Sequence, residues 1–394
     1  MVVPYDLSEP GGGVKHHALG LARALRSLGD TVVVAGPARE PTREPHLVGF
    51  PGVANVQFNG SANRIGIFVN PWTVRRFLRQ NTFDIIHVHE PLAPALPYWM
   101  AWLSGRVPKV CTFHAFAEQP PLGLRLGHRL AAPWVLPRYK RGMAVSLPAQ
   151  NFVSRVWRRP LSIVPNGVNT DLFTPAPDFG LARPVDAKRP LRLFFCARLS
   201  DERKGFPDLL RAYRLLLEKR IPVVLDVAGE AAGPLPPKLP GLTYHGPLPL
   251  ATLVERFQSC DVVVAPSTGQ ESFGIILLEA MASGRPIVCS DIAGYRQVVD
   301  AQGATLCPRR NPESLAVAIA DLAADPERRR TMSIANRERA LHFDWPHLAA
   351  HVRAQYLLAM DNQPEESLHL APARSTPPAL SAASSASAFG ATAQ

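Results

Sequence analysis

Short apolar segments that read as strands alternate with helix-like segments along most of this chain, in two successive sets. This alternation restricts the fold more than any other feature. The first set of expected strands comprises residues 31–35, 84–89, 109–113 and 162–165. The second set comprises residues 191–196, 223–228, 261–265 and 286–290, with a helix expected around 208–218. Strands that are apolar throughout are typical of parallel sheets covered by helices on both faces. The sequence therefore predicts an α/β protein with two Rossmann-like domains and a cleft between them.

The domain boundary is expected at Asn166-Gly167, a dipeptide typical of turns. Residues 1–167 would form the first domain and residues 168–345 the second. A last helix is expected at residues 346–361. Beyond it, residues 362–394 are rich in Pro, Ser, Ala and Thr and nearly free of charge after Arg374. Such a composition cannot build a packed core, so we predict a disordered tail.

The charge and cysteine content restrict the partners. The formal net charge of +11 favours an anionic partner, which could be nucleic acid, an acidic membrane face or a phosphorylated substrate. No zinc-finger spacing or ribonucleoprotein motif occurs, so no nucleic acid is expected. The five cysteines are scattered without CxxC spacing, which predicts reduced thiols and no metal site. No apolar run is long enough to span a bilayer and no secretory signal is visible at the start, so a cytoplasmic location is expected.

Two carboxylates, Glu271 and Glu279, stand eight positions apart at the head of an apolar run that reads as a helix. Gly274 precedes the helix and lets a ligand approach the backbone closely, because it lacks a Cβ. The N-terminus of a helix presents unpaired N–H groups and a partial positive charge, which suits a phosphate. The arrangement fits a sugar attached to a diphosphate, whose hydroxyls would donate to the carboxylates.

Three further motifs follow expected strands. The turn Gly11-Gly12-Gly13 precedes a helix, where a phosphate could bind. His114 stands at a strand end, where an imidazole could donate to a sugar hydroxyl or a phosphate. A loop after residues 191–196 carries Arg198 and Lys204. No D-x-D sequence occurs in the chain, so fixed Arg and Lys would have to balance a diphosphate leaving group.

Together these motifs resemble those of retaining GT-B glycosyltransferases of the glycogen-synthase-like class, glycosyltransferase family 4. More narrowly, they resemble the phosphatidyl-myo-inositol mannosyltransferases. The residues that carry the closer resemblance are Pro4-Tyr5, residues 10–14, 58–64, 87–91, 112–114, 198–205 and 270–281. The resemblance implies the GT-B fold, in which the helix at 346–361 crosses back to the first domain. It also implies a nucleotide diphosphate sugar as co-substrate and no other cofactor.

The resemblance also implies roles for individual residues. His114, Arg198, Lys204 and Glu271 would be catalytic. The donor would contact Gly12, Gly13, Arg203, Leu248, Leu250, Ser272, Phe273, Gly274, Ile275 and Glu279. The acceptor would contact Tyr5, Lys15, Asn59 and Arg64.

The chain departs from this family at four places. Lys15 replaces an expected glutamine and Phe58 an expected tyrosine, which leaves the acceptor open. Leu253 replaces an expected lysine, and residues 228–232 lack the usual glycine spacing, which leaves the nucleotide base open.

A segment at residues 71–79 bears on membrane contact. Arg75, Arg76 and Arg79 alternate there with Trp72, Phe77 and Leu78. This composition is typical of an interfacial helix on an anionic membrane, and equally of a surface helix whose apolar face packs on the core. With the resemblance, it favours peripheral contact with the inner face of the plasma membrane.

The function expected from the sequence is transfer of a hexose, with mannose from GDP-mannose favoured, to a phosphatidylinositol-type or other lipid-linked acceptor with retention of configuration. The alternatives are a GT-B transferase that uses a UDP-sugar and a small or polysaccharide acceptor, a nucleotide-sugar epimerase of the same fold, and a basic nucleic-acid-binding protein.

Overall fold

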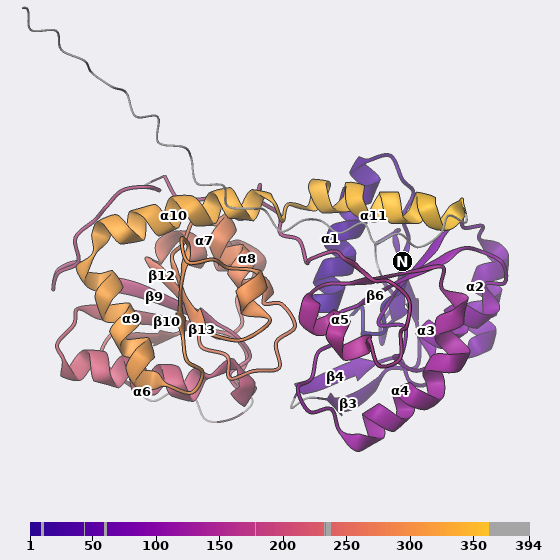
Figure 1. The fold of residues 1–394 in the computed structure, drawn as a ribbon, viewed down its shortest axis with the longest axis horizontal. Helices are drawn as coiled ribbons and strands as arrows, with labels where there is room; N and C mark the ends of the chain where they lie inside the picture. Colours follow the sequence, from indigo (N-terminus) through magenta and orange to yellow (C-terminus); the bar gives the residue numbers. More distant parts are fainter. Residues whose placement is uncertain are drawn as a thin grey trace, which may run out of the picture.

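The computed structural model describes residues 1–361 except residues 9–11, 43, 59–60, 178, 232 and 234–237. The predicted tail at 362–394 and the acceptor candidate Asn59 lie outside the described residues. Two α/β lobes face each other, and the last helix, α11, lies across the top of the N-terminal lobe (Figure 1). Two α/β lobes are what the tandem alternation of strands and helices predicts, and the helix that crosses back is what the resemblance to GT-B enzymes implies.

The N-terminal lobe contains one parallel sheet with helices on both faces and a small antiparallel hairpin, β3–β4. Its elements are α1 (Gly13–Ser27), β1 (Val34–Pro37), β2 (Leu47–Phe50), β3 (Ala54–Phe58), β4 (Ser61–Ile65), α2 (Pro71–Gln80), β5 (Ile86–His89), α3 (Leu96–Leu103), β6 (Lys109–Phe113), α4 (Leu122–Val135), the 3-10 turn η1 (Leu136–Arg138), β7 (Arg141–Ala144), α5 (Leu147–Val153) and β8 (Ser162–Ile163).

The first segment of the chain joins the two parts of this sheet. Val2 forms parallel bridges to Ala35 of β1 and to Val88 of β5, so it lies between the β2–β1 pair and the strands β5-β6-β7-β8. The expected strand at 31–35 instead begins at Val34. Val32, Val34 and Ala35 of this run are buried and Thr31 is exposed. Ladder pairing starts where the N–H groups of Val34 and Ala35 donate to the carbonyls of His46 and Met1.

The C-terminal lobe contains a six-stranded parallel sheet in the order β11-β10-β9-β12-β13-β14. Its elements are β9 (Leu191–Cys196), η2 (Glu202–Lys204), α6 (Phe206–Glu218), β10 (Val223–Ala228), β11 (Leu242–Tyr244), α7 (Leu250–Ser259), β12 (Val262–Ala265), α8 (Ile275–Ala282), β13 (Ile287–Ser290), η3 (Tyr295–Gln297), β14 (Ala304–Cys307), α9 (Pro312–Ala324) and α10 (Pro326–Leu341). The last helix, α11 (Trp345–Met360), follows α10 and packs on the N-terminal lobe. Every residue of β12 and β13 is buried, as expected for strands covered on both faces.

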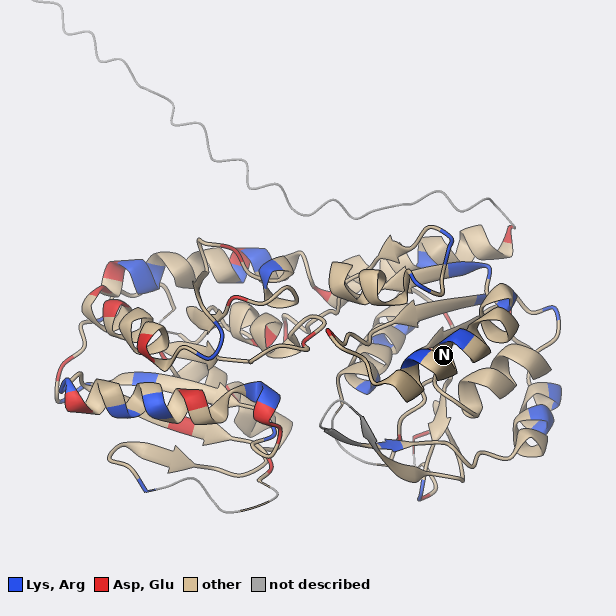
Figure 2. Ribbon diagram, turned by 60° about the horizontal axis from the view of Figure 1, so that its bottom comes forward, with Lys and Arg blue, Asp and Glu red and all other residues tan. Residues whose placement is uncertain are grey.

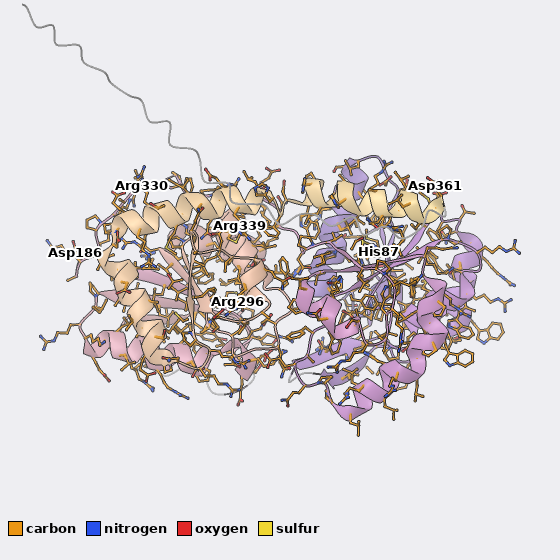
Figure 3. All side chains as sticks on the ribbon, viewed as in Figure 1. His87, Asp186, Arg296, Arg330, Arg339 and Asp361 are labelled. Atoms are coloured by element: carbon orange, nitrogen blue, oxygen red, sulfur yellow. The ribbon has the colours of Figure 1, made fainter. Side chains whose placement is uncertain are left out.

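Two chain segments connect the lobes side by side. Val168 pairs in parallel with Asp344, and its N–H donates to the carbonyl of Phe343. Asp344 caps α11, which packs along α1 and adds Ala349, Val352 and Tyr356 to the core of the N-terminal lobe. Figure 3 shows His87 of β5 beneath α11, and its Nδ1 lies 2.7 Å from the Tyr356 hydroxyl. The crossing helix therefore completes the first lobe's core.

Candidate active site

A cavity of about 190 Å³ lies between the lobes and brings the predicted catalytic residues together. The N-terminal lobe contributes Tyr5, Val14, Asn63, Glu90, His114, Ala115 and Phe116, and the C-terminal lobe contributes Arg198, Arg203, Lys204, Gln270, Glu271 and Ser272. All four residues predicted to be catalytic line this one cavity, although they come from three loops and both lobes.

Two helix N-termini also meet at the cleft. Gly12 and Gly274 precede α1 and α8 with positive φ angles of 93° and 103°, a conformation that favours glycine. A Cβ built on Gly13 would lie 3.3 Å from Cδ1 of Ile275, so the first turns of α1 and α8 are in contact across the lobes. Their free amide groups and partial positive charges suit an anion bound between them.

The cationic side chains of the C-terminal lobe come from the turn after β9. Asp201 caps η2 and holds the Arg203 guanidinium in a bidentate pair, with Oδ1 2.8 Å from Nε. Lys204 pairs with the carboxylate of Glu271, which is itself on the loop before α8. The η2 turn is anchored where Thr268 donates its N–H to the carbonyl of Arg203 at 2.7 Å. The ammonium and the carboxylate are thus in direct contact with each other, and both line the interlobe cavity.

Close backbone packing positions these loops. Gly205 has φ of 71°, and a Cβ there would lie 1.9 Å from the carbonyl oxygen of Pro266. A Cβ on Gly294 would lie 2.2 Å from the carbonyl oxygen of Glu271. Only glycine allows these approaches, so Gly205 and Gly294 let the loops of Lys204 and Glu271 pack closely against neighbouring backbone.

The carboxyl group of Glu279 lies deeper along α8. Burial raises the pKa of Glu279 to about 8. Burial raises the pKa of the Cys196 thiol, at the carboxyl end of β9. The nearby Glu279 carboxyl adds to this rise and the Lys204 ammonium opposes it. Glu279 is therefore close to the cavity without lining it, at the edge of the sheet where a nucleotide is expected.

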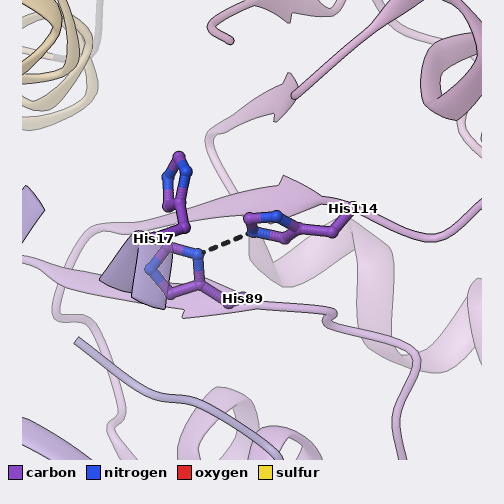
Figure 4. Close-up of side chains that lie close together, drawn as sticks. All are labelled: His17, His89 and His114. Carbon is purple, nitrogen blue, oxygen red and sulfur yellow. Dashed lines mark hydrogen bonds between the residues drawn. The ribbon is translucent and has the colours of Figure 1, made fainter. Parts of the chain in front are cut away.

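Three buried imidazoles lie close together in the N-terminal lobe (Figure 4), and one of them, His114, lines the cavity. Nδ1 of His89 lies 3.0 Å from Nε2 of His114, and Nδ1 of His17 lies 2.8 Å from Oδ1 of Asn166. Burial lowers the pKa of His17 to about 4 and holds the pKa values of His89 and His114 well below their usual range. His114 is thus a neutral imidazole at pH 7, able to donate or accept one hydrogen bond.

The same three histidines could ligate a metal ion, because His17, His89 and His114 can each place a ring nitrogen within 4.8 Å of the others. One ring nitrogen of each histidine already makes a hydrogen bond within the protein. The sequence analysis did not group these residues, since His17 is distant from the other two along the chain.

Glu90 is a second site residue that the sequence analysis did not assign. Its Oε1 accepts the N–H groups of His114 and Ala115, both at 2.6 Å. Burial raises the pKa of Glu90 to about 7, and the two N–H donors oppose that rise. A positive φ of 54° at a non-glycine residue directly after β5 marks the position as special, but the sequence gives no sign of it.

The predicted acceptor residues are only partly brought together. Tyr5 lines the cavity. The backbone of Arg64 lies next to that of Tyr5, because Tyr5 forms an antiparallel bridge to Ile65. Lys15 is buried, with Nζ 3.3 Å from the carbonyl oxygen of Asp6, and it does not line the cavity. Asn63 lines the cavity although no role was predicted for it.

The remaining predicted donor residues lie in the C-terminal lobe, and only some of them reach the cavity. Ser272 lines it, and Phe273 through Ile275 continue into the N-terminus of α8. Leu248 packs partly against the lobe's core, while Leu250 begins α7 and is 53% exposed.

Sequence comparisons agree with this architecture. Residues 11–172 match the family model described as "Glycosyltransferase Family 4", and residues 190–325 match the one described as "Glycosyl transferases group 1". A phosphatidyl-myo-inositol mannosyltransferase from Mycobacterium leprae is 33% identical over 364 residues, covering 90% of this chain and 95% of that protein. The chain belongs to glycosyltransferase family 4. It is a glycosyltransferase with the GT-B fold.

Other relatives and solved structures match over similar lengths. A D-inositol 3-phosphate glycosyltransferase from Thermobispora bispora is 27% identical and is matched over 71% of each chain. A glycosyltransferase from Rickettsia africae has a TM-score of 0.68 at 15% identity, covering 92% of this chain and 99% of that one. HepE from Anabaena, solved in complex with UDP and glucose, has a TM-score of 0.68 at 18% identity, covering 90% and 98%. These structures support the fold.

Proposed function

We propose that this glycosyltransferase moves mannose from GDP-mannose to a phosphatidylinositol-type lipid with retention of the anomeric configuration. The sugar and acceptor are proposed from the mannosyltransferase relatives, which match nearly the whole chain. The observation that carries the chemistry is the convergence of Arg198, Lys204 and two helix N-termini on the cavity that also contains Glu271. Such a set suits a diphosphate sugar held without a metal.

In the proposed reaction the bond between C1 of the sugar and the diphosphate breaks as the acceptor hydroxyl attacks from the same face. The acceptor proton passes to the departing phosphate oxygen. Arg198 and Lys204 would stabilise the charge that grows on the diphosphate, together with the N–H groups that begin α1 and α8.

The other residues would bind and orient. When the diphosphate engages Lys204, the carboxylate of Glu271 becomes free to accept hydrogen bonds from the sugar hydroxyls. His114, neutral at pH 7, would donate to a hydroxyl of the same sugar from the opposite lobe. Tyr5 and Asn63 line the cavity on the acceptor side.

The test is transfer of labelled mannose to phosphatidylinositol in vesicles, with UDP-glucose and a soluble inositol phosphate as the competing donor and acceptor. We expect mannolipid from GDP-mannose, with or without a chelator, and α-linked product by NMR. Product only with the UDP-sugar or the soluble acceptor would replace this proposal with the alternative transferase.

Arg198→Ala should lower the turnover by about 10²–10³-fold, the usual loss when one donor to a developing charge is removed. Arg192→Ala is a matched control, because Arg192 is exposed on β9 of the same lobe. Near-normal turnover of a folded Arg198→Ala variant would remove Arg198 from the proposed mechanism.

A further inference from the structure

Helix α4 exposes a continuous apolar face. Leu122, Leu126, Leu130 and Trp134 recur every fourth residue and are 77%, 55%, 65% and 67% exposed. Residues spaced by four lie on one side of a helix, so the four side chains form a single stripe along α4. Only Ala132 and Val135 of this helix are fully buried, so its larger apolar side chains point outward. Exposed apolar stripes of this kind mark interaction surfaces.

Helix α2, which the sequence analysis favoured for membrane contact, offers less apolar surface. Phe77 and Leu78 pack against the core of the lobe, and only Trp72 of the apolar residues on that helix is strongly exposed, at 70%. Its three arginines are exposed, and Arg75 lies over the Trp72 ring at 5.9 Å. Helix α2 therefore supplies charge, whereas α4 supplies most of the apolar area. Helix α3 packs between the two.

The charge of the protein is concentrated on the same lobe. Residues 1–170 carry 19 Lys and Arg against 8 Asp and Glu, so they account for the whole net charge of +11. Between Glu118 and Asp171 there are eight basic residues and no acidic one. Figure 2 shows that Asp and Glu lie mostly on the other lobe. The chain segment that contains α4 is therefore positively charged, which favours an anionic partner.

A cavity of about 550 Å³ adjoins the C-terminal half of α4. Its lining includes Arg129 of α4 together with Arg155, Arg158 and Arg159. The Arg159 guanidinium stacks on Trp157 at 4.1 Å and donates to the carbonyl of Tyr139 at 2.8 Å, so it forms a fixed wall. Arg155 and Arg158 are exposed at the rim. Guanidinium groups bind phosphate well, because each presents forked N–H donors that match two phosphate oxygens.

Helix α4 is also linked directly to the active site. The loop that precedes it carries His114, Ala115 and Phe116, all of which line the interlobe cavity. Helix α4 and the His114 side of the active site are therefore continuous in the chain.

We propose that the apolar face of α4 and the adjoining arginine-lined cavity dock this enzyme on a bilayer that contains anionic phospholipid. The leucines and Trp134 insert among the acyl chains, and Arg129, Arg155 and Arg158 bind lipid phosphates. This combination of inserted apolar side chains and basic residues is what gives interfacial helices their affinity. The inference adds a docking surface to the proposed lipid acceptor and rests on that proposal for its purpose.

The test is flotation of the full chain with phosphatidylcholine vesicles that contain or lack phosphatidylinositol. We expect binding only to the vesicles with phosphatidylinositol. Leu126→Gln with Leu130→Gln should weaken that binding by about tenfold or more, because two of the four inserting apolar side chains are lost. Arg155→Gln with Arg158→Gln should remove most of the preference for the anionic vesicles.

Matched controls keep the result specific. Val317→Gln with Leu341→Gln replaces two apolar side chains that are each 50% exposed on the other lobe. Arg214→Gln with Lys219→Gln removes the same charge from the exposed face of α6. Both control pairs should bind vesicles as the unaltered protein does. All changes are at exposed positions, and unchanged thermal unfolding confirms that each variant folds.

Equal vesicle binding by the α4 variants and the controls would overturn the proposal. So would loss of binding only with Trp72→Gln on α2, or a dimer in gel filtration that Leu126→Gln with Leu130→Gln dissociates while vesicle binding persists. Thermal protection by GDP-mannose should be the same in every variant. If vesicle binding follows the prediction but no mannolipid forms, the docking surface stands and the proposed function fails. If mannolipid forms equally well with the α4 variants, the proposed function stands and the docking surface fails.

Discussion

Glu279 is a partly buried carboxyl on α8 whose pKa burial raises to about 8. At pH 7 the free protein therefore holds this group mostly in the protonated form. A carboxylate accepts hydrogen bonds from two ribose hydroxyls better than a neutral carboxyl does, so donor binding should favour the ionised form. The donor affinity should consequently rise as the pH is raised toward 8 and above, by up to about tenfold per pH unit below the pKa.

Calorimetric titration with the donor between about pH 6 and about pH 9 measures this effect. Glu279→Gln resembles the protonated side chain, so it should match the unaltered protein at the low end, bind more weakly at the high end and show a flat profile. Glu218→Gln, on the exposed end of α6, is the control and should keep the rise. A rise that survives in Glu279→Gln would mean that another group titrates.

Single residues show where sequence reasoning is sufficient. The placement of Arg198, Lys204 and Glu271 around one cavity could be predicted, because each lies near the end of a strand or the start of a helix in a parallel sheet, where ligands bind. Glu90 could not, because its role is to accept the N–H groups of another loop, and that contact depends on how β5 and β6 pair. The histidine cluster was missed for the same reason.

At the scale of elements, glycines decide where the catalytic loops lie. Gly205 ends η2 with a φ of 71° and packs against the backbone of Pro266. Periodicity predicted helix α6 and the loop before it, but it could not show that a carbonyl oxygen would occupy the place of a Cβ. Likewise it predicted a strand at 31–35, but β1 begins three residues later, at Val34.

Gly205→Ala should lower the free energy of unfolding by about 2–4 kcal/mol, since strain from the positive φ adds to a clash with Pro266. Transfer activity should fall further than stability explains, because Lys204 is the preceding residue. Gly29→Ala is the matched control: its φ is 92°, but a Cβ there meets nothing within 4 Å. It should lose only about 1–2 kcal/mol. Urea unfolding of both variants measures the difference, and equal losses would exclude the clash.

At the scale of the whole molecule, the sequence predicted two lobes because each lobe's strands are contiguous in the chain. It could not predict how the lobes face each other. That arrangement depends on the double connection near Val168 and Asp344 and on Trp345, whose indole packs against Gly20 and Gly167. A Cβ on either glycine would come within 2.6 Å of the indole. This packing brings His114 of one lobe and Glu271 of the other to the same cavity.

One ion pair spans the mouth of the cleft. Arg309 of the C-terminal lobe lies 2.9 Å from Glu118, in the loop before α4, and both side chains are nearly half exposed. An exposed pair contributes only about 0–1 kcal/mol. Because it joins the two lobes in the arrangement that forms the cavity, its loss should act on donor binding more than on stability.

Arg309→Ala should therefore weaken donor binding by up to about fivefold while leaving thermal unfolding unchanged. The difference should disappear at high salt, because screening removes the contribution of exposed pairs. Arg330→Ala is the control, since Arg330 pairs with Glu327 within one helix of the C-terminal lobe. Calorimetry at low and high salt measures both variants. If Arg309→Ala weakened binding equally at both salt concentrations, the guanidinium would be contacting the donor itself, and the pair would not be what holds the lobes together.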